Sequence, residues 1–320
     1  MNLHKFIRRI CAAAVAAALT LSLCTPVLAE GAAALPAAEP GTSQRDETGD
    51  VPIDPAHFPD ENFRKYLGQK AIDDDKNGIL SQTEREKVTA IVLHSAGNIS
   101  DLTGIKYFPN LKELYCNGGD LANLDVSQNT KLTNLYCYNN QLTSLDVSEN
   151  TKLTELDCSD NQLANLDVSE NPELTYLKCG SNQLTRLDLH VNTALETLIC
   201  DNNQLTSLNL SSNTALTQVY CSGNKRQITV GETGQFDLSA LKGFDVSKAS
   251  GWSEGATVDG TILTVPYGVT KISYQYDLGN GKSGAFTLTF NEVKEPDLPD
   301  DSSAPADTGS TAGGAIAAVA

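Results

Sequence analysis

Oxygen-bearing side chains recur at regular spacing between residues 73 and 84, in the sequence DDDKNGILSQTE. This segment matches the calcium-loop pattern D-x-[DN]-x-[DN]-G-x5-E at every required position. Carboxylate, amide and carbonyl oxygens are the ligands that calcium prefers, and the glycine of the pattern allows a sharp turn between them. The predicted calcium ligands are the side chains of Asp73, Asp75, Asn77 and Glu84, the carbonyl of Ile79, and Ser81 directly or through water.

The same residues also fit a purely structural interpretation. Ser81 and Glu84 have the spacing of a capping box, in which a serine and a glutamate satisfy backbone N–H groups at the start of a helix. In that case Asp73 and Asp75 simply face water. The sequence has one such loop and not a cooperative pair, which favours structural locking at extracellular calcium levels over signalling.

A second set of candidate binding residues recurs every 21 residues between Tyr115 and Tyr220. From residue 109 to residue 224 there is no Phe or Trp, and every tyrosine falls at position 3, 5 or 7 of a repeat. Exposed tyrosines offer contact area to proteins, ring faces to sugars and a hydroxyl for hydrogen bonds. Alternatively, the tyrosines only favour strands and stabilise their neighbours across the sheet. The candidate binding residues are Tyr115, Tyr136, Tyr138, Asp157, Tyr176, Lys178, Ile199 and Tyr220.

The element that must position these side chains is a repeat that runs from Leu111 to Asn224 without an insertion. Leucine at positions 1, 4, 11 and 14 of a 21-residue period is typical of a leucine-rich-repeat solenoid with a parallel sheet. Strand alternation places positions 4 and 6 inside and positions 3, 5 and 7 outside. Positions 11 to 20 barely vary between copies whereas positions 5 and 7 do, which separates scaffold from surface.

Position 6 of every copy is a cysteine, which the alternation places in the core. In-register parallel strands hold equivalent Cβ atoms roughly 4.8 Å apart, which exceeds the usual disulfide separation of about 3.5–4.5 Å. Buried thiols in apolar surroundings are also poor nucleophiles and poor metal ligands. The sequence therefore predicts unpaired, structural thiols at Cys116, Cys137, Cys158, Cys179, Cys200 and Cys221.

Asparagines at the two corners of each repeat are predicted to form ladders that satisfy backbone groups of the turns. At position 9, Gly119 replaces the first member of its ladder. The expected members are Asn140, Asn161, Asn182, Asn203 and Asn224 at position 9, and Asn129, Asn150, Asn171, Asn192 and Asn213 at position 19.

The consensus LxxLxCxxNxLTxLDVSxNTx resembles the cysteine-bearing repeats of internalin-type surface proteins of Gram-positive bacteria. The resemblance covers the repeats closely. It implies an extracellular binding role, usually adhesion.

The flanking sequence indicates five further segments. Residues 1–29 have the basic start, apolar run and small-residue end of a secretory signal, and residues 30–50 and 296–320 are expected to be a disordered linker and tail. Residues 51–90 are expected to form a helical, EF-hand-like cap in front of a solenoid over 91–224. An all-β module is expected over residues 225–295.

More detailed expectations apply within the two flanking domains. In the cap, Phe63, Tyr66, Leu67 and Ala71 share one face at helical spacing, and Ala90 to Leu93 form a first strand. In the C-terminal module, Trp252 is expected in the core. Strands are expected at 228–230, 235–241, 257–265, 271–278 and 285–293.

The net charge and the lack of catalytic or phosphate-binding motifs in the sequence limit the classes of function that are expected. A net charge of −17 repels nucleic acid and anionic lipid, and no direct membrane insertion is expected once the signal is cleaved. The histidines lack metal or triad partners at useful spacing, and no glycine-rich phosphate loop occurs, so an enzyme is not expected. The prediction is a secreted or cell-surface protein that binds an extracellular protein or glycan on its strand face. The alternative is a spacer protein without a dedicated ligand.

Overall fold

The computed structural model describes residues 49–93 and 97–295. The expected signal at 1–29, nearly all of the linker and the tail at 296–320 lie outside the described residues. Within the described ranges, no helix is both long and apolar enough to cross a bilayer.

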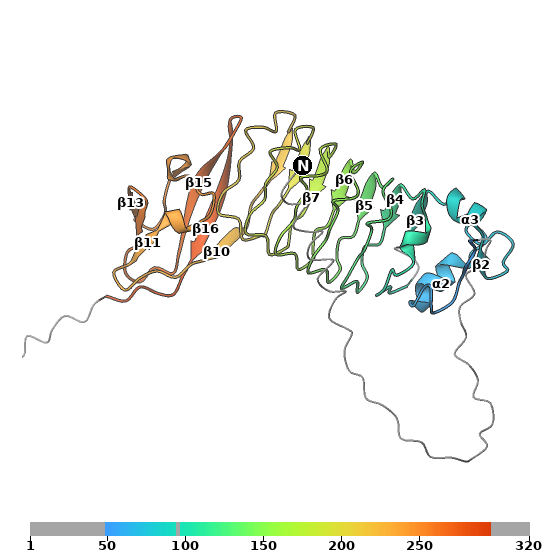
Figure 1. Cartoon of the computed structure of the whole chain (residues 1–320). Coiled ribbons are helices and arrows are strands. Elements are labelled where there is room, and N and C mark those ends of the chain that lie inside the picture. The colour runs from blue at the N-terminus through green and yellow to red at the C-terminus, as the bar shows by residue number, and fades with distance from the viewer. Residues whose placement is uncertain (1–48, 94–96, 296–320) are drawn as a thin grey trace, which may run out of the picture. The chain divides into compact units, whose positions relative to one another are not determined.

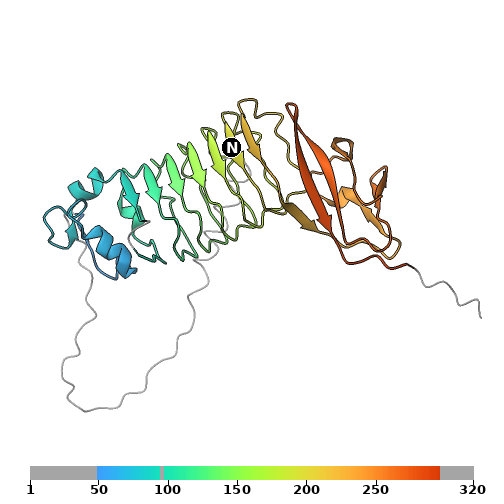
Figure 2. The ribbon, with the colours of Figure 1, turned by 180° about the vertical axis from the view of Figure 1, so that it is seen from behind.

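The repeats form one parallel sheet of seven strands in sequence order, as predicted for a leucine-rich-repeat solenoid (Figure 1). From β4 onward each residue pairs with the residue 21 positions later, for example Leu114 with Leu135 and Leu135 with Leu156. Figure 2 shows the same strands from behind. The strands are β3 (Ala90–Val92), β4 (Glu113–Tyr115), β5 (Asn134–Tyr136), β6 (Glu155–Asp157), β7 (Tyr176–Lys178), β8 (Thr197–Ile199) and β9 (Gln218–Tyr220).

The core of the solenoid consists of stacked columns of leucines and cysteines. Leu132, Leu135 and Leu142 are all completely buried, and each contributes about 1.5–3 kcal/mol by leaving water. All six cysteines of the repeats are buried and free, which confirms the predicted unpaired ladder. Burial raises the pKa of the Cys116 thiol to about 12, so the column is held in its neutral, unreactive form.

The two predicted asparagine ladders are confirmed, and they differ in detail. At position 9, Asn161 donates to the carbonyls of Cys137 and Cys158 at 3.0 and 3.1 Å and accepts from the Leu142 N–H at 3.0 Å. At position 19, Asn150 donates to two carbonyls at 3.0 Å, but its own Oδ1 is buried without a partner. Only the first ladder therefore uses both ends of the amide.

The N-terminal part contains α2 (Glu61–Leu67) and α3 (Gln82–Lys87), with a short antiparallel pair of β1 (Val51–Pro52) and β2 (Ile79–Leu80). Phe63 and Leu67 are buried as predicted, but the helix ends at Leu67 because Gly68 forms its C-cap. Ala71 therefore lies beyond the helix and is exposed, contrary to expectation. The Tyr66 hydroxyl accepts from the Val92 N–H at 3.0 Å and covers part of the sheet edge at β3.

The C-terminal β module contains a four-stranded and a three-stranded sheet. Its contacts with the last full repeat include a 2.6 Å hydrogen bond from the Tyr274 hydroxyl to the Thr206 carbonyl, and one of 2.7 Å from the Leu210 N–H to the Leu278 carbonyl. The strands are β10 (Asn224–Gln227), β16 (Lys282–Thr289), β15 (Lys271–Gly279) and β12 (Ala249–Ser250), then β11 (Gln235–Asp237), β14 (Ile262–Thr264) and β13 (Thr257–Asp259).

Several strand predictions for this module were wrong in detail. The strand expected at 257–265 is a hairpin of β13 and β14, because Gly260 and Thr261 turn the chain between Asp259 and Ile262. The strand expected at 235–241 gives way after Asp237 to a 3-10 helix. The strand expected at 228–230 lies earlier, as β10. Trp252 is half-buried and stacks on Tyr274 at 4.5 Å, so it covers the aromatic core and does not form its centre.

Candidate functional site

The strand face carries a stacked pair of tyrosines. Tyr115 and Tyr136 are neighbours in the register of β4 and β5, and their ring centroids lie 4.8 Å apart with planes only 7° from parallel. The pair follows from the repeat period, which places the same position of consecutive copies side by side. Both side chains are half-buried, so each is partly packed against its neighbours and partly accessible to solvent.

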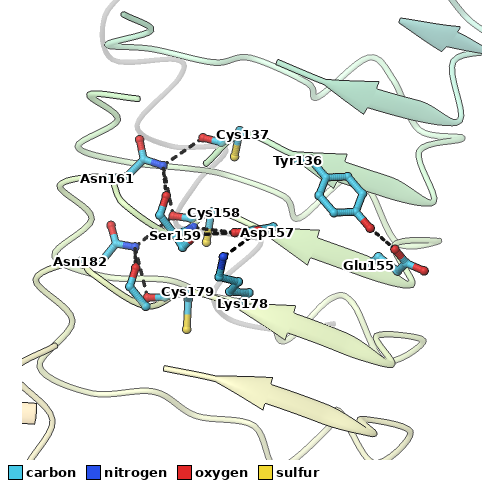
Figure 3. A network of polar contacts seen from close by, with 11 residues as sticks. Tyr136, Cys137, Glu155, Asp157, Cys158, Ser159, Asn161, Lys178, Cys179 and Asn182 are labelled. Atoms are coloured by element: carbon cyan, nitrogen blue, oxygen red, sulfur yellow. Dashed lines mark hydrogen bonds and ion pairs between the residues drawn. The ribbon is translucent and has the colours of Figure 1, made fainter. Parts of the chain in front are cut away.

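A carboxylate holds the outer end of this pair, as Figure 3 shows. The Tyr136 hydroxyl donates a hydrogen bond to Glu155, which lies on the next strand. Burial, followed by this hydrogen bond and the nearby negative charge, raises the pKa of Tyr136. The phenol therefore stays protonated and keeps donating. Glu155 was not among the residues predicted from the sequence, although its diagonal position beside Tyr136 follows from the 21-residue spacing.

Asp157 differs from its prediction as an outward-facing binding residue, because it is only 5% exposed. Its carboxylate accepts from the backbone N–H of Ser159 at 3.0 Å and from the Ser159 hydroxyl at 2.6 Å. The Lys178 ammonium lies 3.4 Å from the same carboxylate (Figure 3). It also lies 5.6 Å from the centre of the Tyr138 ring. Asp157 is thus a buried anchor that positions Lys178, and it offers little surface to a ligand.

The other predicted binding residues lie on the same face at different exposures. Tyr176 and Ile199 are half-buried on β7 and β8. Tyr220 is 51% exposed on β9, the last strand of the sheet. The candidate residues therefore form one continuous surface, with the packed polar network in its middle and an open tyrosine at its C-terminal edge.

The acidic loop brings together three of its predicted ligands. Oxygen atoms of Asp73, Asp75 and Glu84 lie within 4.8 Å of one another. Asp73 and Glu84 are 2% and 5% exposed, and Asp73 Oδ1 is buried without any hydrogen-bond partner. A buried carboxylate oxygen left without a partner is costly, so this atom points to an absent ligand or water.

The capping box and the oxygen cluster coexist in this loop. The Ser81 N–H and hydroxyl donate to Glu84 at 2.9 and 2.7 Å, and the Glu84 N–H returns a bond to the Ser81 hydroxyl. The structural alternative thus describes Ser81 and Glu84 correctly. It fails for Asp73, which is buried and does not face water.

The predicted ligand set also includes the Asn77 side chain and the Ile79 carbonyl. Asn77 and Ile79 are exposed, and the Asn77 side chain accepts from the Ile79 N–H at 2.7 Å. The Ile53 N–H donates to the Gly78 carbonyl at 2.9 Å, next to the pairing of β1 with β2. The loop is therefore tied to the chain that precedes it.

Comparison with known proteins supports the repeat architecture. The sequence profile of the family described as "Leucine Rich repeats (2 copies)" matches residues 130–171. No curated protein matches the chain.

Similar solved structures include internalin C2 of Listeria monocytogenes, at 22% identity over 55% of this chain and 88% of that one, with a TM-score of 0.44. Another is the functional domain of Listeria monocytogenes InlJ, described as including a cysteine ladder, at 18% identity over 75% and 98% of the two chains, with a TM-score of 0.25. A leucine-rich-repeat protein of Leptospira interrogans matches at 23% identity over 48% and 42%, with a TM-score of 0.43. The matched repeat profile, the seven-stranded parallel sheet and the buried free cysteines give the chain the fold of a leucine-rich-repeat solenoid with a buried cysteine ladder.

Proposed function

We propose that this chain is a non-enzymatic, secreted or cell-surface binding protein that recognises an extracellular protein or glycan on the face of strands β3–β9. The observation that carries the proposal is that each repeat has a nearly constant half and a variable half. Positions 11 to 20 stay nearly constant, whereas positions 5 and 7 vary and hold the stacked and half-buried tyrosines. Variable aromatic side chains on a rigid sheet are suited to recognition.

Three further observations support this proposal. The likeness of the repeat consensus to internalin-type repeats favours a surface protein, and the signal expected at residues 1–29 favours export. His57 and His190 lie 2.8 and 2.9 Å from Asp54 and Asp188 of their own turns, which is an arrangement of exposed turns and not of a catalytic triad.

The test is binding of the purified protein to mucins, matrix proteins and wall glycans. Replacing Tyr136 and Tyr138 together with alanine is expected to weaken a bound partner by about 2 kcal/mol or more, over tenfold in affinity. The Ser144→Ala variant, altered on the constant half of the same repeat, is expected to bind and melt like the unmodified protein. If no probe binds, the spacer alternative is favoured. If a probe binds and the double variant binds it normally, the protein has a partner but Tyr136 and Tyr138 do not contact it.

We further propose that the acidic loop binds one structural calcium ion. Asp73, Asp75 and Glu84 supply the carboxylates, with Asn77, Ile79 and Ser81 completing the set. The unpartnered, buried oxygen of Asp73 supports this fit. A divalent cation neutralises the repulsion among three carboxylates within 4.8 Å and locks the loop against strand β1.

A thermal unfolding series tests the calcium proposal. At calcium one hundred times above the dissociation constant, binding to the folded state adds about 2.7 kcal/mol of stability, a rise in Tm of roughly 5–10 °C. Glu84→Gln is expected to abolish this rise while keeping an acceptor for the capping box. Glu86→Gln removes the same charge from the neighbouring exposed position and is expected to retain the rise. Identical melting curves in EDTA and in calcium for the unmodified protein would contradict calcium binding.

A further inference from the structure

Neighbouring side chains cover part of the tyrosine rings in the middle of the strand face. Tyr115 and Tyr136 lie face to face, with centroids 4.8 Å apart and planes 7° from parallel, so each ring covers one face of the other. The Lys178 ammonium covers one face of Tyr138, 5.6 Å from its centre. These half-buried side chains thus leave at most one ring face, the ring edges and the hydroxyl ends to a partner.

This orientation bears on the class of partner. A sugar docks on an aromatic side chain by laying its C–H groups on an open, electron-rich ring face, whereas the edge of the ring is electropositive. A stacked pair keeps at most one open face per ring, which makes it a poorer sugar platform than two separate tyrosines. Proteins use tyrosine differently, as a rigid anchor whose area and hydroxyl are both buried in the interface.

The charges around the stack determine the chemistry of the partner. The Tyr136 hydroxyl donates to Glu155 and the Tyr115 hydroxyl to Glu113 at 3.4 Å, so the phenolic protons are used inside the molecule. Carboxylate oxygens remain as acceptors at the outer surface. Positions 3, 5 and 7 of the six repeats carry four carboxylates and one ammonium, and that ammonium, on Lys178, is paired with Asp157.

We infer that the strand face binds a protein segment bearing arginine or lysine, which seats its cations against Glu113 and Glu155 and packs its side-chain stems on the edges of the Tyr115–Tyr136 stack. The inference rests on the proposed binding function of the same face. A guanidinium or ammonium group adds a charged donor to carboxylates that otherwise accept only from a neutral phenol, while complementary charge selects the partner and speeds its association.

The experiment pans a random peptide library and a set of mucin and wall glycans against the full purified chain. Recovered peptides are expected to be enriched in arginine and lysine, and their association rate is expected to fall as salt is raised. Glu155→Gln is expected to weaken them about tenfold, because it removes one charge-assisted contact. Glu149→Gln removes an equal charge from the exposed corner of the preceding repeat and is expected to leave binding and melting unchanged.

The possible outcomes separate this inference from the proposed function. Glycan binding that is lost in Tyr220→Ala, whose side chain is 51% exposed, but kept in Glu155→Gln overturns the inference and leaves the binding function standing. Enrichment of neutral or acidic peptides also overturns it. If neither peptides nor glycans bind, the proposed function and the inference both fail. A shared melting curve for the two glutamine variants excludes misfolding as the cause of any loss.

Discussion

Replacing Asn161 with alanine tests what holds the corner of each repeat. Its amide donates to the carbonyls of Cys137, Cys158 and Ser159 at 3.0, 3.1 and 3.1 Å. Its oxygen accepts from the Leu142 N–H at 3.0 Å. Alanine removes all four bonds at a buried position, where water cannot easily replace them.

The size of the effect follows from these bonds. Leaving the Leu142 N–H buried without an acceptor costs about 1–3 kcal/mol, and each lost carbonyl bond costs roughly 0.5–1.5 kcal/mol. Because the carbonyls keep some alternative partners, we expect a total loss of about 3–4 kcal/mol. Asn150 provides the matched comparison, since it donates to two carbonyls while its own oxygen has no partner. Asn150→Ala is therefore expected to cost only about 1–2 kcal/mol.

Urea unfolding followed by circular dichroism measures both variants, with the slope of each transition checked for equality so that the midpoints are comparable. The reasoning is refuted if Asn161→Ala costs no more than Asn150→Ala. That result would mean that the N–H of Leu142 finds water or another acceptor, and that the two ladders are energetically equivalent.

Two further predictions concern the thiols and the first repeat. The folded protein is expected to react negligibly with a thiol reagent at pH 8, because burial raises the pKa of Cys116 and Cys158 to about 12. Denaturation without reductant is expected to expose all six thiols of the repeats. Fewer than about two titrated thiols would exclude the unpaired ladder. Gly119→Asn restores the repeat consensus but is expected to lower Tm, because a Cβ at this position lies 2.5 Å from the Ile99 carbonyl oxygen. A raised Tm would show that the backbone at Ile99 shifts without cost.

The sequence alone determined the solenoid, its register and its interior. A period of 21 residues without insertions places equal positions of consecutive copies side by side, so a column in the alignment becomes a column in space. The unpaired cysteines and both asparagine ladders follow directly from that rule. The helix over Glu61–Leu67 and the acidic loop were also recognisable, because capping and turn chemistry act within a few neighbouring residues.

The C-terminal module was less predictable because it has no repeat to fix its boundaries. Short apolar runs there fit strands of several lengths, and the extent of each strand depends on its partner in the sheet. The pairing of β10 with β16, more than fifty residues away in the chain, is an example.

Only the tertiary structure decided what the strand face presents. Alternation predicts that Asp157 points outward, and it does, yet Lys178 from the next strand and Ser159 bury it. Whether a side chain at an outward position is accessible depends on the rotamers of its neighbours on adjacent strands, which local sequence does not specify. The same dependence turned the faces of Tyr115 and Tyr136 toward each other and brought the half-buried Glu155 to the Tyr136 hydroxyl.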